Sequence, residues 1–120
     1  MSRARGTRAS GDPLAALLAL SGAIAVIAGA YGAHGASGKP AEWLATGAHY
    51  QMIHAVAGLV ALQKGRGPAA LMLFGAALFA GTLYAMAFDG PRWLGAVTPL
   101  GGMAMILGWM WLAVVYLRGR

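Results

Sequence analysis

Four long segments without a charged side chain dominate the sequence, and short polar turns separate them. The segments cover residues 14–35, 43–63, 69–88 and 95–117. Each has about the 20 residues that an α-helix needs to cross a lipid bilayer. In lipid, backbone amides and carbonyls must pair within their own segment, so we expect helices. The alternating pattern of a membrane barrel strand is absent from the sequence. The chain therefore predicts an all-α membrane fold.

The composition excludes two other classes of protein. Hydrophobic residues make up 59% of the 120-residue chain and charged residues 10%, whereas roughly 25% of residues are charged in soluble domains. Three acidic and nine basic residues cannot cover the surface of so small a soluble fold. Intrinsic disorder requires the opposite balance of low hydrophobicity and high charge. With no cysteine, the chain has no disulfide, thiol nucleophile or thiolate metal site.

The segments and turns predict one domain behind a short tail. We expect residues 1–12 to form a disordered basic tail and residues 13–118 to form a four-helix transmembrane domain. The expected helices cover about residues 13–35, 41–63, 68–88 and 95–117. Because the connections are short, neighbouring helices should run antiparallel and form an integral membrane bundle.

The basic residues predict the orientation of this bundle. Antiparallel helices bring the two termini and the middle turn to one side, and only Lys39 and Arg92 lie on the other. An excess of Lys and Arg marks the cytoplasmic side, so we expect both termini in the cytoplasm of a multi-pass bacterial plasma (inner) membrane protein. This bias also accounts for the net charge of +6, and no nucleic-acid partner is expected. The first side carries Arg3, Arg5, Arg8, Lys64, Arg66, Arg118 and Arg120.

The first segment has an alternative interpretation as a cleaved signal peptide. Basic residues precede the apolar run 14–20 and small residues follow it. Cleavage would leave three helices and an external N-terminus. The apolar run continues past the length of a typical signal core, which favours a retained helix.

Small residues recur at helical spacing in three of the segments. Lipid gives helices no hydrophobic reason to associate, so small residues that permit close backbone approach are typical of helix interfaces in membranes. We interpret these stripes as helix-packing faces rather than as the lining of a pore. The stripes are Gly22, Ala25 and Gly29; Ala77, Gly81 and Ala85; and Gly101, Ala104 and Gly108.

Three histidines are the candidate ligand side chains within the apolar segments. The first hairpin should place His34 and His49 at similar depth, with His54 roughly 7 Å deeper. Tyr50 and Gln51 precede His54 by four and three residues, which gives the second helix one polar face. Such a face normally points into the bundle, so these five residues are a candidate polar cluster.

Three roles remain open for the cluster. Hydrogen bonds between helices, worth about 0.6–2 kcal/mol each, are the favoured one. Haem or a metal could be bound by His34 with His49 or His54, since neutral imidazole suits these groups, although no His-x-x-His spacing supports this. A path for protons or a small solute usually includes an acid within a span, and none is present. We therefore expect no catalytic residue, cofactor or metal.

Four short motifs resemble, in order, the signatures of the membrane family called domain of unknown function 423. Tyr31 stands where this family has phenylalanine, and Ala80 and Thr82 stand where it has serine. The resemblance covers residues 14–117 and implies a small four-helix membrane protein of the UPF 0382 type, related to animal transmembrane protein 256. It implies no particular activity. The motifs are Gly29–Gly35, His49–Ala55, Phe79–Tyr84 and Leu94–Gly102.

Together these features predict a small integral membrane protein that is not an enzyme and has a structural or accessory role. Its surroundings would be the lipid bilayer, and its small-residue faces would hold a homo-oligomer or a larger membrane complex. A small permease or channel component is the first alternative. A histidine-ligated haem or metal-binding redox protein is the second.

Overall fold

A computed structural model of the chain describes residues 10–119, and the regular secondary structure in this range is entirely helical. The predicted all-α fold is therefore confirmed. Residues 1–9 of the expected tail lie outside the described range. The helices are α2 (Pro13–His34), α3 (Gly38–Ala61), α4 (Arg66–Ala87) and α5 (Leu94–Leu117).

The helix limits follow from capping and proline chemistry. Asp12 caps α2: its carboxylate accepts hydrogen bonds from the amides of Leu14 (3.0 Å) and Ala15 (3.3 Å). Pro13 occupies the first helical position, where its missing amide costs nothing. The expected range 41–63 is shifted in α3, which begins at Gly38 because Pro40 is tolerated in a first turn.

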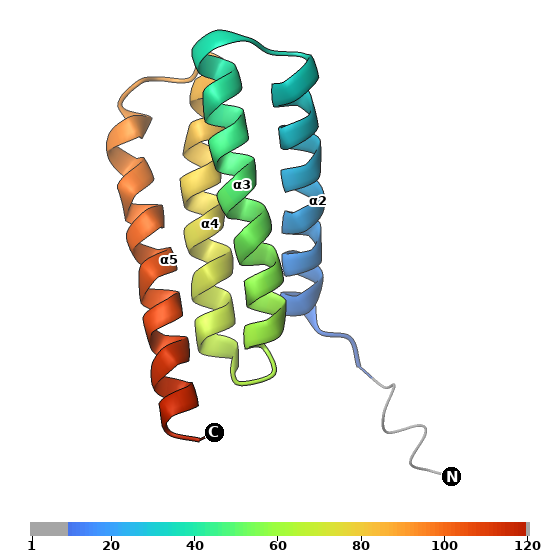
Figure 1. Cartoon of the computed structure of the whole chain (residues 1–120), viewed down its shortest axis with the longest axis vertical. Helices are drawn as coiled ribbons and strands as arrows, with labels where there is room; N and C mark the ends of the chain where they lie inside the picture. Colours follow the sequence, from blue (N-terminus) through green and yellow to red (C-terminus); the bar gives the residue numbers. More distant parts are fainter. Residues whose placement is uncertain (1–9, 120) are drawn as a thin grey trace.

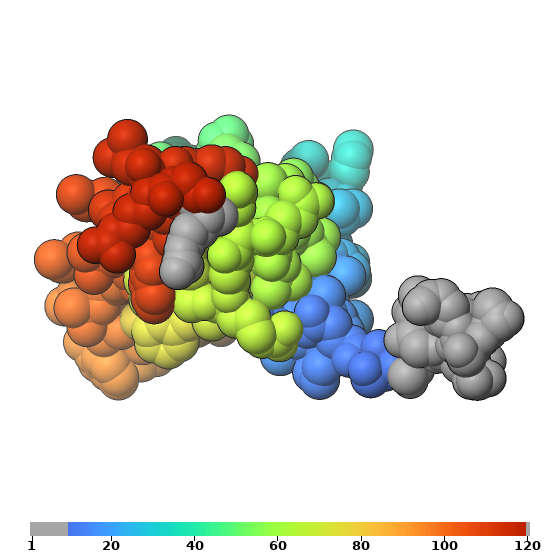
Figure 2. Space-filling view, turned by 90° about the horizontal axis from the view of Figure 1, so that it is seen from below, coloured from blue at the N-terminus to red at the C-terminus, as the bar shows by residue number. Residues whose placement is uncertain are grey.

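The four helices stand side by side as an open, zigzag row (Figure 1). Consecutive helices run antiparallel and pack closely, while α2 makes only slight contact with α4. Seen end-on, α2 and α5 lie at opposite sides of the molecule (Figure 2). The row is therefore not closed by packing between its first and last helices.

Two apolar clusters lie between the helices, one near each end of their length. Near the α3–α4 loop, Leu18 of α2 and Met72 of α4 are fully buried with small alanines and Leu112. Near the opposite end, Leu44 of α3 is buried with Ala28 and Ala48. Between the clusters, the buried positions include polar side chains, so the middle of the row depends on hydrogen bonds as well as packing.

The outer surface of the row is strongly apolar. Large hydrophobic side chains are exposed along α2 and α5, including Ile27 (68%) and Met110 (60%). Exposed apolar area of this extent marks a membrane or an interaction surface. By length and composition α2, α4 and α5 can each cross a membrane. The described helix α3 is not in that group, because Thr46, His49, Gln51 and His54 interrupt its apolar residues.

Candidate functional site

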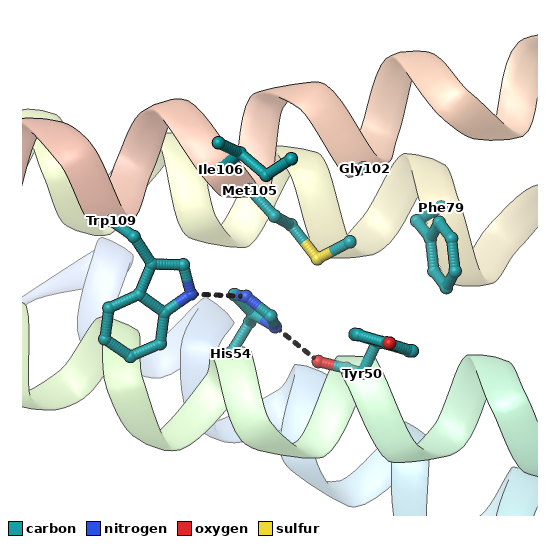
Figure 3. Close-up of a pocket in the computed structure, with 7 residues that line it drawn as sticks. All are labelled: Tyr50, His54, Phe79, Gly102, Met105, Ile106 and Trp109. Atoms are coloured by element: carbon teal, nitrogen blue, oxygen red, sulfur yellow. Dashed lines mark hydrogen bonds between the residues drawn. The ribbon is translucent and has the colours of Figure 1, made fainter.

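His54 lies at the centre of the buried polar residues and joins α3 to α5. Its ring accepts a hydrogen bond at Nε2 from the indole Nε1–H of Trp109, at 2.9 Å. Its Nδ1 lies 2.7 Å from the carbonyl oxygen of Tyr50 (Figure 3). An indole only donates and a carbonyl only accepts, so these partners require a neutral imidazole with its proton on Nδ1. Both ring nitrogens are thus engaged within the chain.

Gln51 joins three helices through its side-chain amide. Its nitrogen donates to the hydroxyl of Ser21 on α2 at 3.0 Å. Its oxygen accepts a hydrogen bond from the hydroxyl of Tyr84 on α4 at 2.6 Å. Gln51 and Ser21 are buried, so their side chains lose their hydrogen bonds to water on folding. The bonds within the chain replace those lost hydrogen bonds.

Two threonines link α4 to α5. The hydroxyl oxygens of Thr82 and Thr98 lie 2.6 Å apart. Each hydroxyl also lies 3.0 Å from a carbonyl oxygen of its own helix, that of Phe79 and that of Leu94 respectively. Two hydroxyl protons serve these three contacts, so only two of the three hydrogen bonds form at any moment.

The five residues of the candidate polar cluster are distributed over different surroundings. Gln51 and His54 are buried, whereas Tyr50 is 42% exposed. His49 is exposed on α3, and His34 is exposed at the end of α2. The structure therefore does not bring the three histidines into one buried cluster. Within residues 10–119 there is no group of three or more potential metal ligands.

Four of the hydrogen-bonding partners were not singled out by the sequence. Ser21, Thr82, Thr98 and Trp109 each complete a hydrogen bond between helices. The signal available for them is chemical: a polar group buried away from water needs a partner, so each hydroxyl or indole within an apolar segment is a candidate.

A pocket of about 380 Å³ opens beside His54, between α3 and α5. Figure 3 shows Phe79 of α4 facing it together with residues of the two flanking helices. Gly102 lies on its α5 side, and a methyl group there would come no closer than 3.9 Å to the Phe79 ring. The pocket is thus largely aromatic and partly open to the surroundings. Its lining residues are Tyr50, His54, Phe79, Gly102, Met105, Ile106 and Trp109.

The small-residue stripes of α2 and α5 face neighbouring helices. On α2, a methyl group at Gly22 would lie 3.6 Å from the Cβ of Ala55 on α3, and one at Gly29 would lie 3.5 Å from that of Ala48. On α5, a methyl group at Gly101 would lie only 2.7 Å from the carbonyl oxygen of Gly75 on α4. Close backbone approach therefore depends on glycine at Gly101, whereas Gly22 and Gly29 leave room for an ordinary methyl contact.

The stripe of α4 has different surroundings. Ala77, Gly81 and Ala85 are exposed, and a methyl group at Gly81 would meet no atom within 4 Å. The small residues of α4 that are buried in the row are instead Gly75, Ala76 and Ala80. The α4 stripe is therefore a surface of the single chain.

An ion pair joins the starts of α2 and α4 at the end that carries both termini. The Arg66 guanidinium donates to both carboxylate oxygens of Asp12, at 2.9 and 3.1 Å. The hydrogen bond from Arg66, aided by the helix amides, lowers the pKa of Asp12 below its usual value. The two residues lie 54 positions apart, and their pairing was not predicted.

Comparisons with known proteins identify one family. A family model described as a protein of unknown function, DUF423, matches residues 28–102. A UPF0382 membrane protein of Haemophilus influenzae is 40% identical over 108 residues, covering 81% of this chain and 87% of the relative. The UPF0382 membrane protein YwdK of Bacillus subtilis is 39% identical over 113 residues, covering 83% and 92%.

A third relative carries a more specific name. The UPF0382 inner membrane protein YgdD of Escherichia coli is 36% identical over 112 residues, covering 83% of this chain and 86% of the relative. No solved structure matches the chain significantly.

Proposed function

The chain belongs to the DUF423 family, whose relatives are named as UPF0382 membrane proteins, and we propose that it is a structural component of the bacterial plasma membrane. In this proposal it crosses the bilayer four times and associates with membrane proteins through the exposed face of α4. The E. coli relative is named as an inner membrane protein, which supports this location.

The fourth crossing is α3, in which Gln51 and His54 face other helices. Both are buried against α2, α4 and α5, while Ile53, Val56 and Val60 are exposed. Lipid would therefore meet mainly apolar side chains on the second half of α3, whereas Thr46 and His49 are exposed on its first half. Its 24 residues extend about 36 Å, against a hydrocarbon thickness of about 30 Å. The length of α3 and the apolar side chains of its second half both support a crossing.

The ends of the row differ in charge, which supports a cytoplasmic location for both termini. The start of α2, the end of α5 and the α3–α4 loop lie at the same end (Figure 1). This end carries Lys64, Arg66 and Arg118, and the sequence has Arg3, Arg5 and Arg8 before α2. The opposite end carries Lys39 and Arg92. An excess of Lys and Arg at one end is typical of the side of a membrane protein that stays in the cytoplasm.

The structural role rests on one observation: of the three small-residue stripes in the described chain, that of α4 alone is exposed at all three positions. The stripes of α2 and α5 have helices against them. Ala77, Gly81 and Ala85 are exposed at the four-residue spacing that permits close helix approach in lipid. A transmembrane helix of another subunit could pack there with backbone-to-backbone contact.

The buried polar residues support a structural role as well. Each of the five forms a side-chain bond to a neighbouring helix: Ser21, Gln51, His54, Thr82 and Thr98. We interpret these buried polar residues as hydrogen-bonded links between helices rather than as a path through the bilayer.

Photo-crosslinking from the α4 face tests this role, because the natural chain has no cysteine to compete. The Gly81→Cys variant is labelled with a benzophenone maleimide and irradiated in native membranes. We expect covalent adducts with protein, either a second copy or another membrane protein. The matched control is Ala113→Cys, at an exposed position of α5.

The control defines the result that counts. Protein adducts at Gly81→Cys that exceed those at Ala113→Cys support the proposal, and the adduct identifies the partner. Adducts with lipid only at both positions would show that lipid covers the α4 face, and the proposed association would then be wrong.

A further inference from the structure

The aromatic pocket between α3 and α5 has the dimensions of a ligand site. Its volume of about 380 Å³ falls within the roughly 300–1,000 Å³ of small-molecule sites. Such sites combine an apolar lining with a few placed polar groups, and they occur between helices of bundles. The pocket lies against α3 and α5, apart from the α4 stripe.

The pocket opens towards the surface that lipid would cover. Tyr50 is 42% exposed and Trp109 is 44% exposed, and both line the pocket. Exposed Ile106 continues the same surface on α5. A ligand would thus enter from the hydrocarbon and must be soluble in the membrane. This step rests on the membrane placement in the proposed function, and not on the association through α4.

Aromatic rings form most of the pocket wall. The ring of Phe79 lies edge-on to Tyr50 with centroids 5.1 Å apart, and Trp109 lies edge-on to His54 at 5.8 Å. Tyr50 and His54 are stacked at 6.4 Å with 24° between their planes. Aromatic walls favour offset-stacked or edge-on contact with another ring. The lining therefore suits a flat conjugated ring better than a saturated acyl chain.

One hydroxyl group at the pocket remains available for a ligand. The indole N–H of Trp109 and both nitrogens of His54 are already hydrogen-bonded. The Tyr50 hydroxyl has no hydrogen-bond partner among residues 10–119. We propose that this pocket binds a membrane-dissolved molecule with a flat ring and a carbonyl oxygen, the chemistry of an isoprenoid quinone, with Tyr50 donating to the carbonyl.

Titration of the purified full chain in detergent tests the site, with decylubiquinone as the probe and calorimetry as the measurement. We expect saturable binding near one quinone per chain. Gly102→Leu should reduce the affinity at least tenfold, because its side chain would fill the pocket from a position where a methyl group meets nothing closer than 3.9 Å. Tyr50→Phe keeps the ring and loses the donor, so a loss of about 2–12-fold is expected for one hydrogen bond.

Two controls make the outcome decisive. Ala113→Leu places the same side chain elsewhere on α5, at an exposed position, and should bind like the natural chain. Dodecanol, a saturated alcohol, should not compete with the quinone. Unchanged affinity in both Gly102→Leu and Tyr50→Phe, or equal binding of dodecanol, would overturn the proposal.

The same variants separate this inference from the association through α4. A Gly102→Leu chain that loses quinone binding but keeps protein adducts from the cysteine placed at Gly81 supports both proposals. Quinone binding without protein adducts would overturn the association alone.

Discussion

The indole of Trp109 donates a hydrogen bond of 2.9 Å to the imidazole of His54, and so joins two helices that otherwise pack little against each other. In the zigzag row, α3 and α5 are both packed on α4. The bond therefore connects helices that are not neighbours along the chain. It also holds His54 as a neutral donor to the Tyr50 carbonyl.

The first prediction concerns this bond. His54→Ala should lower the melting temperature in mild detergent, because the Trp109 N–H loses its partner and a gap opens at a buried position. In a double-mutant cycle with His54→Leu and Trp109→Phe, the coupling free energy should be about 0.6–1.7 kcal/mol. Unchanged stability in His54→Ala, or a coupling near zero, would contradict a structural role for the pair.

The second prediction concerns acid and the Asp12–Arg66 ion pair. Folding lowers the pKa of Asp12, mainly through the hydrogen bond from Arg66. The folded chain therefore binds this proton less readily than the unfolded chain, whose Asp has a pKa of about 3.9. The stabilisation is complete above that pH and is lost as the pH falls through the lower pKa of the folded chain.

Asp12→Asn isolates the charge, because asparagine can still cap α2. We expect the variant to melt at a lower temperature than the natural chain near neutral pH. The difference should shrink on acidification and vanish once Asp12 is protonated in the folded chain. A difference that stays constant from neutral to strongly acid pH would mean that the ion pair does not contribute.

The third prediction compares two glycines at the interface between α4 and α5 with one glycine on the exposed face of α4. A methyl group at Gly75 would lie 2.7 Å from the backbone nitrogen of Met105, and one at Gly101 would clash with the backbone nitrogen of Phe79. Gly75→Ala and Gly101→Ala should therefore destabilise the chain by about 1–3 kcal/mol. In detergent Gly81→Ala should be neutral or slightly stabilising, since its methyl group meets nothing within 4 Å. Equal effects at Gly81 and Gly101 would show that α4 and α5 pack differently.

The inward position of Gln51 and His54 could be predicted because it depends on one helix alone. Residues three apart share a helix face whatever the neighbouring helices are. Their partners could not be predicted in the same way, since Ser21 and Trp109 lie 30 and 55 positions away. Which of them meets Gln51 or His54 depends on the order and rotation of the helices.

The three histidines differ in their depth along the helices and in the side of the helix on which they lie. His34 and His49 come from a hairpin that predicts a similar depth for both, but depth does not specify the side of the helix. In the structure both side chains are exposed, whereas that of His54 is buried. Small residues raise the same difficulty in α4, where they occur on two faces. Gly75, Ala76 and Ala80 are buried and Gly81 is exposed, so small size alone could not select the packed face.

The four-crossing arrangement depends most on α3, and labelling of single cysteines in intact cells tests it directly. A membrane-impermeant maleimide is added to cells that carry Ser37→Cys, Gln63→Cys or Pro91→Cys, one at each connection between helices. We expect labelling of Ser37→Cys and Pro91→Cys in intact cells. Gln63→Cys should be labelled only after the cells are opened. Labelling of Ser37→Cys and Gln63→Cys from the same side would show that α3 does not cross the membrane, and the four-crossing arrangement would then be wrong.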